Sequence, residues 1–230
     1  MIKYKKKRFA FTSYQQTFLL FFITLFVCIA CSEREKQIEL NPKYSEIQNI
    51  VSIAQCKGPG GNYVTEVTSF EDGGGLFTQK YDYQKNFYSR INSDSTGYVL
   101  SEQGDTLQAL PRNAVEVIRS HEFHRLHINP NHFFHEFKYI NNENDLEVYN
   151  ALDRLNRTAK IYYSRKEKLI EKVELTNPLD TLQTIEIQHK KWMDTEYGKM
   201  VKELEIVQAK KDTFYFNFEN IQINTLKNEI

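Results

Sequence analysis

NYVTEVTSFEDGGGLFTQKYDYQKNFYSRI, residues 62–91, is the stretch that decides the fold class. Apolar and polar side chains alternate along it in three runs, at residues 63–67, 77–81 and 87–91. Alternation with a period of two is typical of strands that bury one face, and the segments between the runs are short and rich in turn-forming Gly, Asp and Asn. The stretch therefore predicts three half-buried antiparallel strands joined by hairpins.

The same alternation continues through the second half of the chain. The later predicted strands lie at residues 146–152, 159–163, 169–175, 182–187, 200–207 and 214–223. With the first three strands and a Gly-containing hairpin at 98–105, the total is about ten strands. Between the two groups of strands, Leu110-Pro111 begins a predicted helix that runs to about His127, where Asn129-Pro130 interrupts it. A helix between two runs of hairpins indicates an α+β fold, a single antiparallel sheet with helices against one face.

Two shorter helices are also expected. Tyr44, Ile47, Ile50, Val51 and Ala54 are spaced by three and four residues, which predicts an amphipathic helix that stops before the Gly-rich residues 58–61. A further helical turn is expected at 132–137. Two or three helices would then cover the sheet.

Charge excludes one class of partner. The 30 basic residues equal the 30 acidic ones, but residues 1–30 hold five basic residues and no acidic one, so the rest of the chain has 25 basic and 30 acidic residues, a net charge of −5. Such a domain has no basic surface for a nucleic-acid backbone. Nucleic acid is not an expected partner.

The N-terminus resembles the export signal of a bacterial lipoprotein. A basic segment precedes the apolar run TFLLFFITLFVCIA at residues 17–30, which is shorter than the roughly 20 residues that a membrane-spanning helix needs. The run ends in Cys28-Ile29-Ala30-Cys31, which resembles the lipobox, with Cys28 where the lipobox prefers an aliphatic residue. The resemblance implies that Cys31 is diacylated and then becomes the mature N-terminus when residues 1–30 are removed, that residues 31–44 form a lipidated tether, and that residues 45–230 form the domain. Ser32 resembles a signal for the outer membrane, so the expected location is the cell envelope, on a lipid anchor.

The order of elements resembles the LolA/LolB-like superfamily of lipoprotein carriers. The resemblance rests on the hairpin at 98–105, Leu110-Pro111, the strand 160–163 and the closing stretch FNFENIQIN at 216–224. It implies an incomplete barrel whose concave face encloses an apolar cavity under the helices, for a lipid or for lipoprotein acyl chains. The candidate lining residues are Phe77, Tyr81, Phe87, Phe214, Phe216 and Phe218, although for any one of them an ordinary place in the core is the favoured interpretation.

Five of the six histidines lie at residues 121–135. His121 with His124, or His132 with His135, have the spacing at which two imidazoles on a helix can share a Zn²⁺ ion. The order matches neither H-E-x-x-H nor H-x-x-E-H, no G-x-S-x-G motif is present, and the glycine-rich segments lack a following Lys-Ser/Thr. No catalytic residue or cofactor is therefore expected.

Three functions fit these features. The first is a non-enzymatic, membrane-anchored protein that binds an apolar ligand in the envelope. The second is an accessory subunit of an envelope complex without a small ligand, whose protein partner is unknown. The third is a metal-binding protein that uses the histidine cluster.

The lipid anchor can be tested directly. Replacing Cys31→Ala should abolish both labelling by radioactive palmitate and the removal of residues 1–30, because the resemblance makes the Cys31 thiol the acceptor of the lipid that precedes cleavage. Cys28→Ala is the matched control and should leave both labelling and cleavage intact. Palmitate labelling of the Cys31→Ala chain would contradict the lipobox assignment.

Overall fold

The computed structural model describes residues 37–177, 180, 182–209 and 211–226, and its described residues lie in one compact unit, Gln37–Ile230. The predicted signal peptide, Cys31 and residues 32–36 of the predicted tether lie outside the described residues. At the start of the described part, the side chain of Asn41 accepts a hydrogen bond from the Lys43 amide and caps a short 3-10 helix, η1 (Pro42–Glu46). Among the described residues, no helix is long and apolar enough to span a bilayer.

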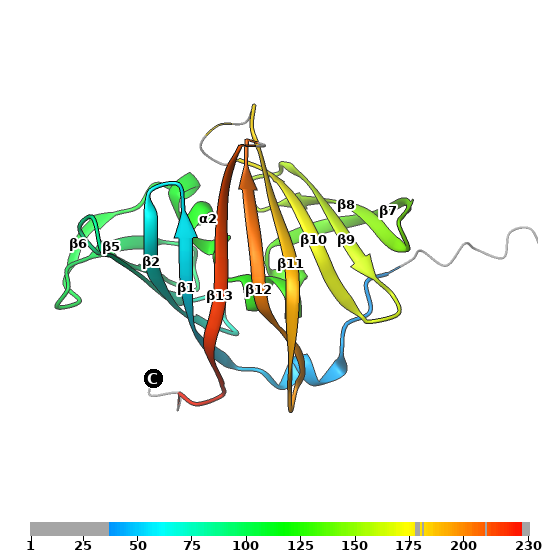
Figure 1. Cartoon of the computed structure of the whole chain (residues 1–230), viewed down its shortest axis with the longest axis horizontal. Helices are drawn as coiled ribbons and strands as arrows, with labels where there is room; N and C mark the ends of the chain where they lie inside the picture. The colour runs from blue at the N-terminus through cyan, green and yellow to red at the C-terminus, as the bar shows by residue number, and fades with distance from the viewer. Residues whose placement is uncertain (1–36, 178–179, 181, 210, 227–230) are drawn as a thin grey trace, which may run out of the picture. The chain divides into compact units, whose positions relative to one another are not determined.

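One antiparallel sheet forms the body of the molecule (Figure 1). Over the described residues it has thirteen strands in the spatial order β6-β5-β4-β3-β2-β1-β13-β12-β11-β10-β9-β8-β7, so every strand pairs with its neighbour in sequence except at one place. The strands are β1 (Asn49–Gly58), β2 (Gly61–Phe70), β3 (Gly75–Tyr81), β4 (Phe87–Ile91), β5 (Gly97–Leu100), β6 (Thr106–Ala109), β7 (Phe134–Glu143), β8 (Leu146–Asp153), β9 (Thr158–Ser164), β10 (Leu169–Thr176), β11 (Thr184–Thr195), β12 (Gly198–Gln208) and β13 (Asp212–Ile223).

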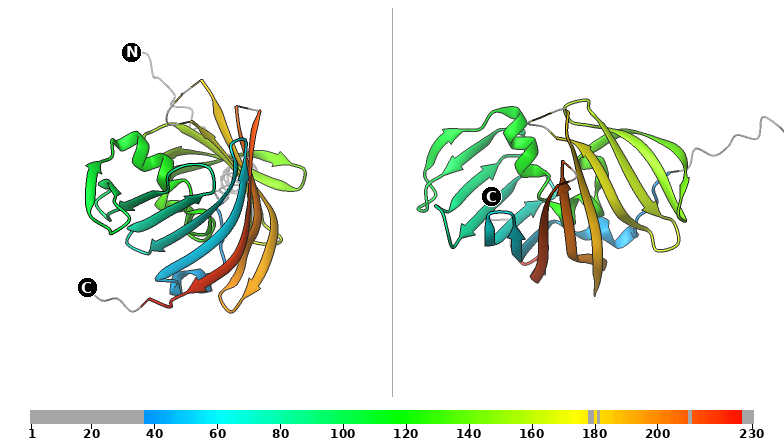
Figure 2. Two further views of the ribbon diagram at one scale, coloured as in Figure 1. Left: turned by 60° about the vertical axis from the view of Figure 1, so that its left-hand side comes forward. Right: turned by 45° about the horizontal axis from the view of Figure 1, so that its top comes forward.

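The sheet curves but stays open between β6 and β7, which are consecutive in sequence and form its two edges. Between them the chain makes α2 (Arg112–Arg119), α3 (Phe123–Ile128) and a 3-10 turn, η2 (Pro130–His132). Figure 2 shows these helices inside the curve of the sheet. The expected open, curved antiparallel sheet with two α-helices on its concave face is confirmed, although the single helix predicted from Leu110 to His127 is divided at Ser120–Glu122.

The predicted strand count of ten was wrong because three strands escaped the sequence patterns. The stretch at 44–54, predicted to be helical, is mostly β1: Ile50, Ser52 and Ala54 are buried in alternation, and Ile50 and Ala54 fit both a period of two and a spacing of four. All four residues of β6 are exposed, so this strand has no apolar alternation. The predicted turn at 132–137 is largely β7, an edge strand that pairs only with β8.

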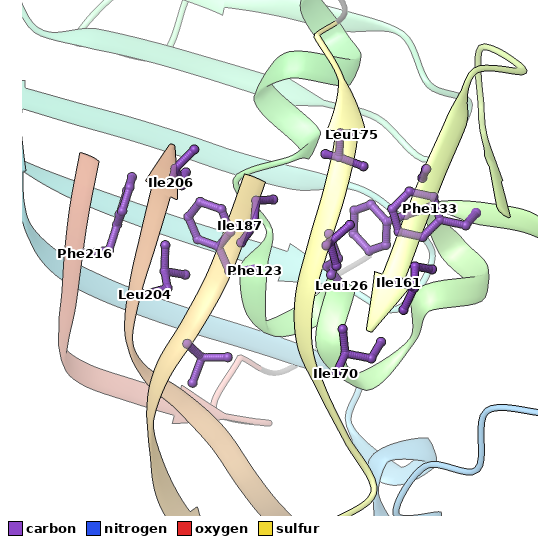
Figure 3. Close-up of a cluster of buried hydrophobic side chains, with 14 of the residues drawn as sticks. Phe123, Leu126, Phe133, Ile161, Ile170, Leu175, Ile187, Leu204, Ile206 and Phe216 are labelled. Carbon is purple, nitrogen blue, oxygen red and sulfur yellow. The ribbon is translucent and has the colours of Figure 1, made fainter. Parts of the chain in front are cut away.

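The main core lies between α3 and the concave face of the sheet (Figure 3). All six residues of α3 are buried, and Phe123 and Leu126 are each 1% exposed. They pack among side chains of β9 to β13, among them Ile161, Ile170, Ile187, Leu204 and Phe216. Burying one such side chain contributes about 1.5 to 3 kcal/mol, so this helix is a major source of the free energy of folding.

Two arginines join the helices to the strands that surround them. The Arg125 guanidinium donates to the backbone carbonyls of Ile47, Gln48 and Ser69, which ties α3 to the segment before β1 and to the end of β2. Arg154, in the turn after β8, donates to the carbonyl of His132 at 2.7 Å and to the hydroxyl of Ser95 at 2.9 Å. These contacts connect the two halves of the sheet across its opening.

Truncating the α3 core should destabilise the whole fold. Leu126→Ala removes a side chain that is 1% exposed, and we expect the free energy of unfolding to fall by roughly 2 to 5 kcal/mol, as measured by urea denaturation. The control is Leu107→Ala on β6, where the side chain is 65% exposed and the change should stay within about 0.5 kcal/mol. Equal effects of the two substitutions would show that α3 does not anchor the core.

Candidate functional site

A cavity of about 420 Å³ lies beside α2, where the helix faces the ends of β1 to β3 and β11 to β13. One wall is apolar and is made by Val117 of α2, Ile185 and Ile187 of β11, Ile206 of β12, and Phe214 and Phe216 of β13. The alternation of these strands points every second side chain at the concave face, where the cavity lies. α3 fills the neighbouring part of that face, so the cavity is what remains at the α2 end.

Tyrosines make the opposite wall. The ring centroids of Tyr63 and Tyr81 are 5.2 Å apart, and those of Tyr81 and Tyr83 are 5.4 Å apart in an edge-to-face arrangement. The ring of Phe216 meets Tyr63 edge to face at 6.2 Å, which continues the aromatic surface into the apolar wall. Tyr83 is 47% exposed, so this end of the cavity reaches solvent.

Glycines in the hairpin between β1 and β2 allow this packing. A Cβ atom at Gly58 would lie 2.7 Å from Cδ1 of Phe214, closer than two carbon atoms can approach. A Cβ atom at Gly61, where φ is +119°, would lie 3.1 Å from the Tyr83 ring. The glycine-rich segment at 58–61 was predicted to be a turn, and its second role is to let two cavity side chains lie flat against the backbone.

The described lining residues carry no Asp, Glu, Lys or Arg. The polar ones, apart from the tyrosines, are Gln79, Gln84, Asn177, Gln208, Ser120 and His121. Burial raises the pKa of the Tyr81 phenol and lowers the pKa of the His121 imidazole, so both groups are neutral near pH 7. The cavity is therefore polar in places but uncharged.

Three of the six predicted lining residues border this cavity, namely Tyr81, Phe214 and Phe216. Phe77 instead packs with Val67, Ile91 and Val115 in a separate small core, and Phe218 packs against the rings of Phe123 and His124. Phe87 is half-buried on β4 opposite Gln79. The sequence reasoning missed Tyr63 and Tyr83, because strand alternation gives the face of a residue but not which part of that face the helices leave open.

The structure gives the four histidines of the metal hypothesis four different environments. His121 Nδ1 donates to the Val117 carbonyl at 2.9 Å, and His124 Nε2 donates to the Val201 carbonyl at 3.0 Å. His132 contacts the guanidinium groups of Arg119 and Arg154, and His135 is exposed on β7. In the part of the chain that the structure describes, no group of three or more His, Cys, Asp or Glu side chains could hold a metal ion.

A different group of imidazoles is brought together in the core. His127 of α3 and His189 of β11 have ring centroids 6.0 Å apart, and both rings pack on Trp192, at 4.6 Å and 5.2 Å. Burial lowers the pKa of His189 and that of His124 to about 4, so these rings are neutral near pH 7. Their spacing in sequence gave no sign of this grouping.

A second hollow, of about 380 Å³, lies on the outer face of β1, β12 and β13. Its two carboxylates are both paired with lysines, since Lys190 pairs with Glu205 at 2.9 Å and Lys191 pairs with Glu203 at 2.8 Å. Pairs of this kind on an exposed strand surface are typical of a solvated face. The concave cavity is the better candidate site.

The fold is LolA-like. It resembles that of a LolA superfamily protein from Nitrosomonas europaea, with a TM-score of 0.57 and 10% sequence identity over 83% of this chain and 94% of that one. Two other structures are more distant. A DUF1329 family protein from Desulfovibrio piger has a TM-score of 0.42 and 10% sequence identity over 80% of this chain and 90% of that one. A putative outer membrane lipoprotein-sorting protein domain from Vibrio parahaemolyticus has a TM-score of 0.40 and 8% sequence identity over 79% of this chain and 88% of that one. No protein-family model and no curated protein matches the sequence. The expected LolA-like architecture is thus confirmed, as a likeness of fold.

Buried neutral histidines should make the fold sensitive to acid. The pKa of His124 is about 4 in the folded chain, below its ordinary value of 6.5, so its stabilising contribution is complete above pH 6.5 and is lost as the pH falls toward 4. Between pH 7 and pH 4.5, the free energy of unfolding in urea should therefore fall by roughly 2 kcal/mol more in the unaltered chain than in His124→Gln. His135→Gln, at an exposed position, should keep the original pH dependence, and a pH dependence unchanged by His124→Gln would refute the assignment.

Proposed function

We propose that this LolA-like chain is a lipid-anchored protein of the bacterial envelope that binds an apolar ligand, a lipid or the acyl chains of a lipoprotein, in its concave cavity. The observation that carries the proposal is the apolar wall of that cavity, built by β11 to β13 and by Val117 inside an open curved sheet. Acyl chains need shape and dispersion contacts more than polar partners. The lipobox-like residues 28–31 support the anchor and the envelope location, and Ser32 supports the outer membrane.

Binding, not catalysis, is the proposed activity. The hydroxyl of Ser120 and the imidazole of His121 both donate to the carbonyl of Val117, so neither activates the other as a nucleophile and base would. Burial raises the pKa of the Cys56 thiol to about 12, which keeps this side chain protonated and unreactive. These contacts support a site that holds a ligand without transforming it.

A second candidate is an accessory subunit that binds another protein through an edge of the sheet. All four residues of β6 are exposed, including Leu107 at 65%, and the outer side of this strand has no partner strand among the described residues. An exposed edge can accept a strand of another chain. This function needs no cavity, so a ligand-binding measurement separates it from the first.

Ligand binding can be tested by placing a larger side chain of α2 in the cavity. Residues 32–230, which include the whole compact unit, are titrated with the uncharged fluorescent probe N-phenyl-1-naphthylamine, and Val117→Trp should weaken binding at least tenfold because the larger ring occupies the apolar space. Ile140→Trp, at a position 44% exposed on β7, is the matched control and should bind the probe normally.

Two results would count against ligand binding. One is the absence of saturable probe binding by the unaltered chain. The other is equal affinity in Val117→Trp and the unaltered chain. Either result, together with a stoichiometric protein partner whose capture requires β6, would favour the accessory-subunit function.

A further inference from the structure

At the open end of the cavity, the described lining residues include polar side chains but no Lys or Arg. Tyr83 and Gln84 follow β3 and are exposed, while Gln79 lies on the strand itself. The hydroxyl of Tyr81 donates to Oε1 of Gln79 at 2.6 Å. That bond uses the amide oxygen of Gln79 and leaves its NH₂ group as a neutral donor. The side chains of Gln84 and Gln208 also carry neutral NH₂ donors. The open end thus offers hydrogen bonds without a net charge.

An anionic headgroup would be poorly accommodated at this end. A carboxylate or phosphate that enters a partly buried site gives up its hydration, and this loss is offset only where a cation or several strong donors replace the water. None of the described lining residues is Lys or Arg, and the imidazole of His121 already donates to a backbone carbonyl. A cationic headgroup likewise finds no Asp or Glu among the described lining residues to offset its lost hydration.

The volume limits the apolar part of the ligand. At about 420 Å³ the cavity is near the lower end of the range of roughly 300 to 1,000 Å³ that small-molecule sites occupy. α3 fills the adjacent concave face with Phe123 and Leu126, which closes the route by which the cavity could extend along the sheet. A single chain is therefore a better match than a lipid with two or three.

We infer that the cavity selects an uncharged, single-chain amphiphile, whose chain lies against Phe214, Phe216 and Ile206 and whose hydroxyl, ester or amide headgroup meets the tyrosine and glutamine side chains at the open end. This inference rests on the proposed function and narrows it to one class of ligand. Free fatty acids and phospholipids belong to the classes that the cavity discriminates against.

Three ligands with the same 14-carbon chain length test the inference: monomyristoylglycerol, myristate and tetradecyltrimethylammonium. Each is used at pH 8, below its aggregation threshold, to displace N-phenyl-1-naphthylamine from residues 32–230. Monomyristoylglycerol should displace the probe at a concentration at least tenfold lower than either charged ligand. Equal displacement by all three would overturn the headgroup inference and leave ligand binding intact, whereas no probe binding at all would overturn both.

A substitution that adds charge gives an independent readout. Gln84→Lys places a cation at the exposed open end and should improve displacement by myristate at least fivefold without improving displacement by tetradecyltrimethylammonium. Gln103→Lys, in the exposed turn between β5 and β6, adds the same charge away from the cavity and should change neither value. If both lysines improve myristate binding equally, overall charge and not the cavity controls the preference, and the inference fails.

Discussion

The packing of α3 against the concave face of the sheet is the interaction on which the rest of the structure depends. The last strand, β13, pairs with β1 in the middle of the sheet, which leaves β6 and β7 as its two edges. The sheet could close into a barrel only if these two edge strands paired with each other. The segment between those two strands forms helices instead, and α3 lies inside the curve with all six of its residues buried. Moving a helix that is buried on all sides away from the sheet would expose the apolar core to water. The packing of α3 therefore keeps the sheet curved and the barrel open.

The position of α3 also decides where space remains. Phe123 and Leu126 fill the concave face beside β9 to β13, while the preceding helix, α2, presents Val117 to a part of the face that no other helix covers. The cavity is thus a consequence of dividing the insertion at Ser120–Glu122. A single continuous helix would cross the sheet differently and would change which strands the cavity touches.

Several of the buried polar side chains in the core hydrogen-bond to backbone carbonyls. Arg125 donates to three carbonyls, and His124 donates to one. Buried donors of this kind satisfy carbonyls at strand ends, where an open sheet leaves more of them unpaired than a closed barrel does. His121, His124 and His127 therefore have a structural explanation in this fold, since burial keeps their imidazoles neutral and they pack beside the rings of Phe123, Phe218 and Trp192.

The sequence by itself determined the antiparallel sheet and the helical insertion at Leu110-Pro111, because period-two alternation and turn residues are local signals. The LolA-like architecture was implied by the resemblance of the order of elements to that superfamily. It failed at β1, where the spacing of Ile50 and Ala54 suits a strand as well as a helix, and at β6 and β7, where edge strands bury too little to show a pattern. Only the tertiary structure decided the cavity. Tyr63 precedes Ile185 and Phe214 by more than a hundred residues, and which aromatic residues face open space depends on where α3 lies, which no local pattern encodes.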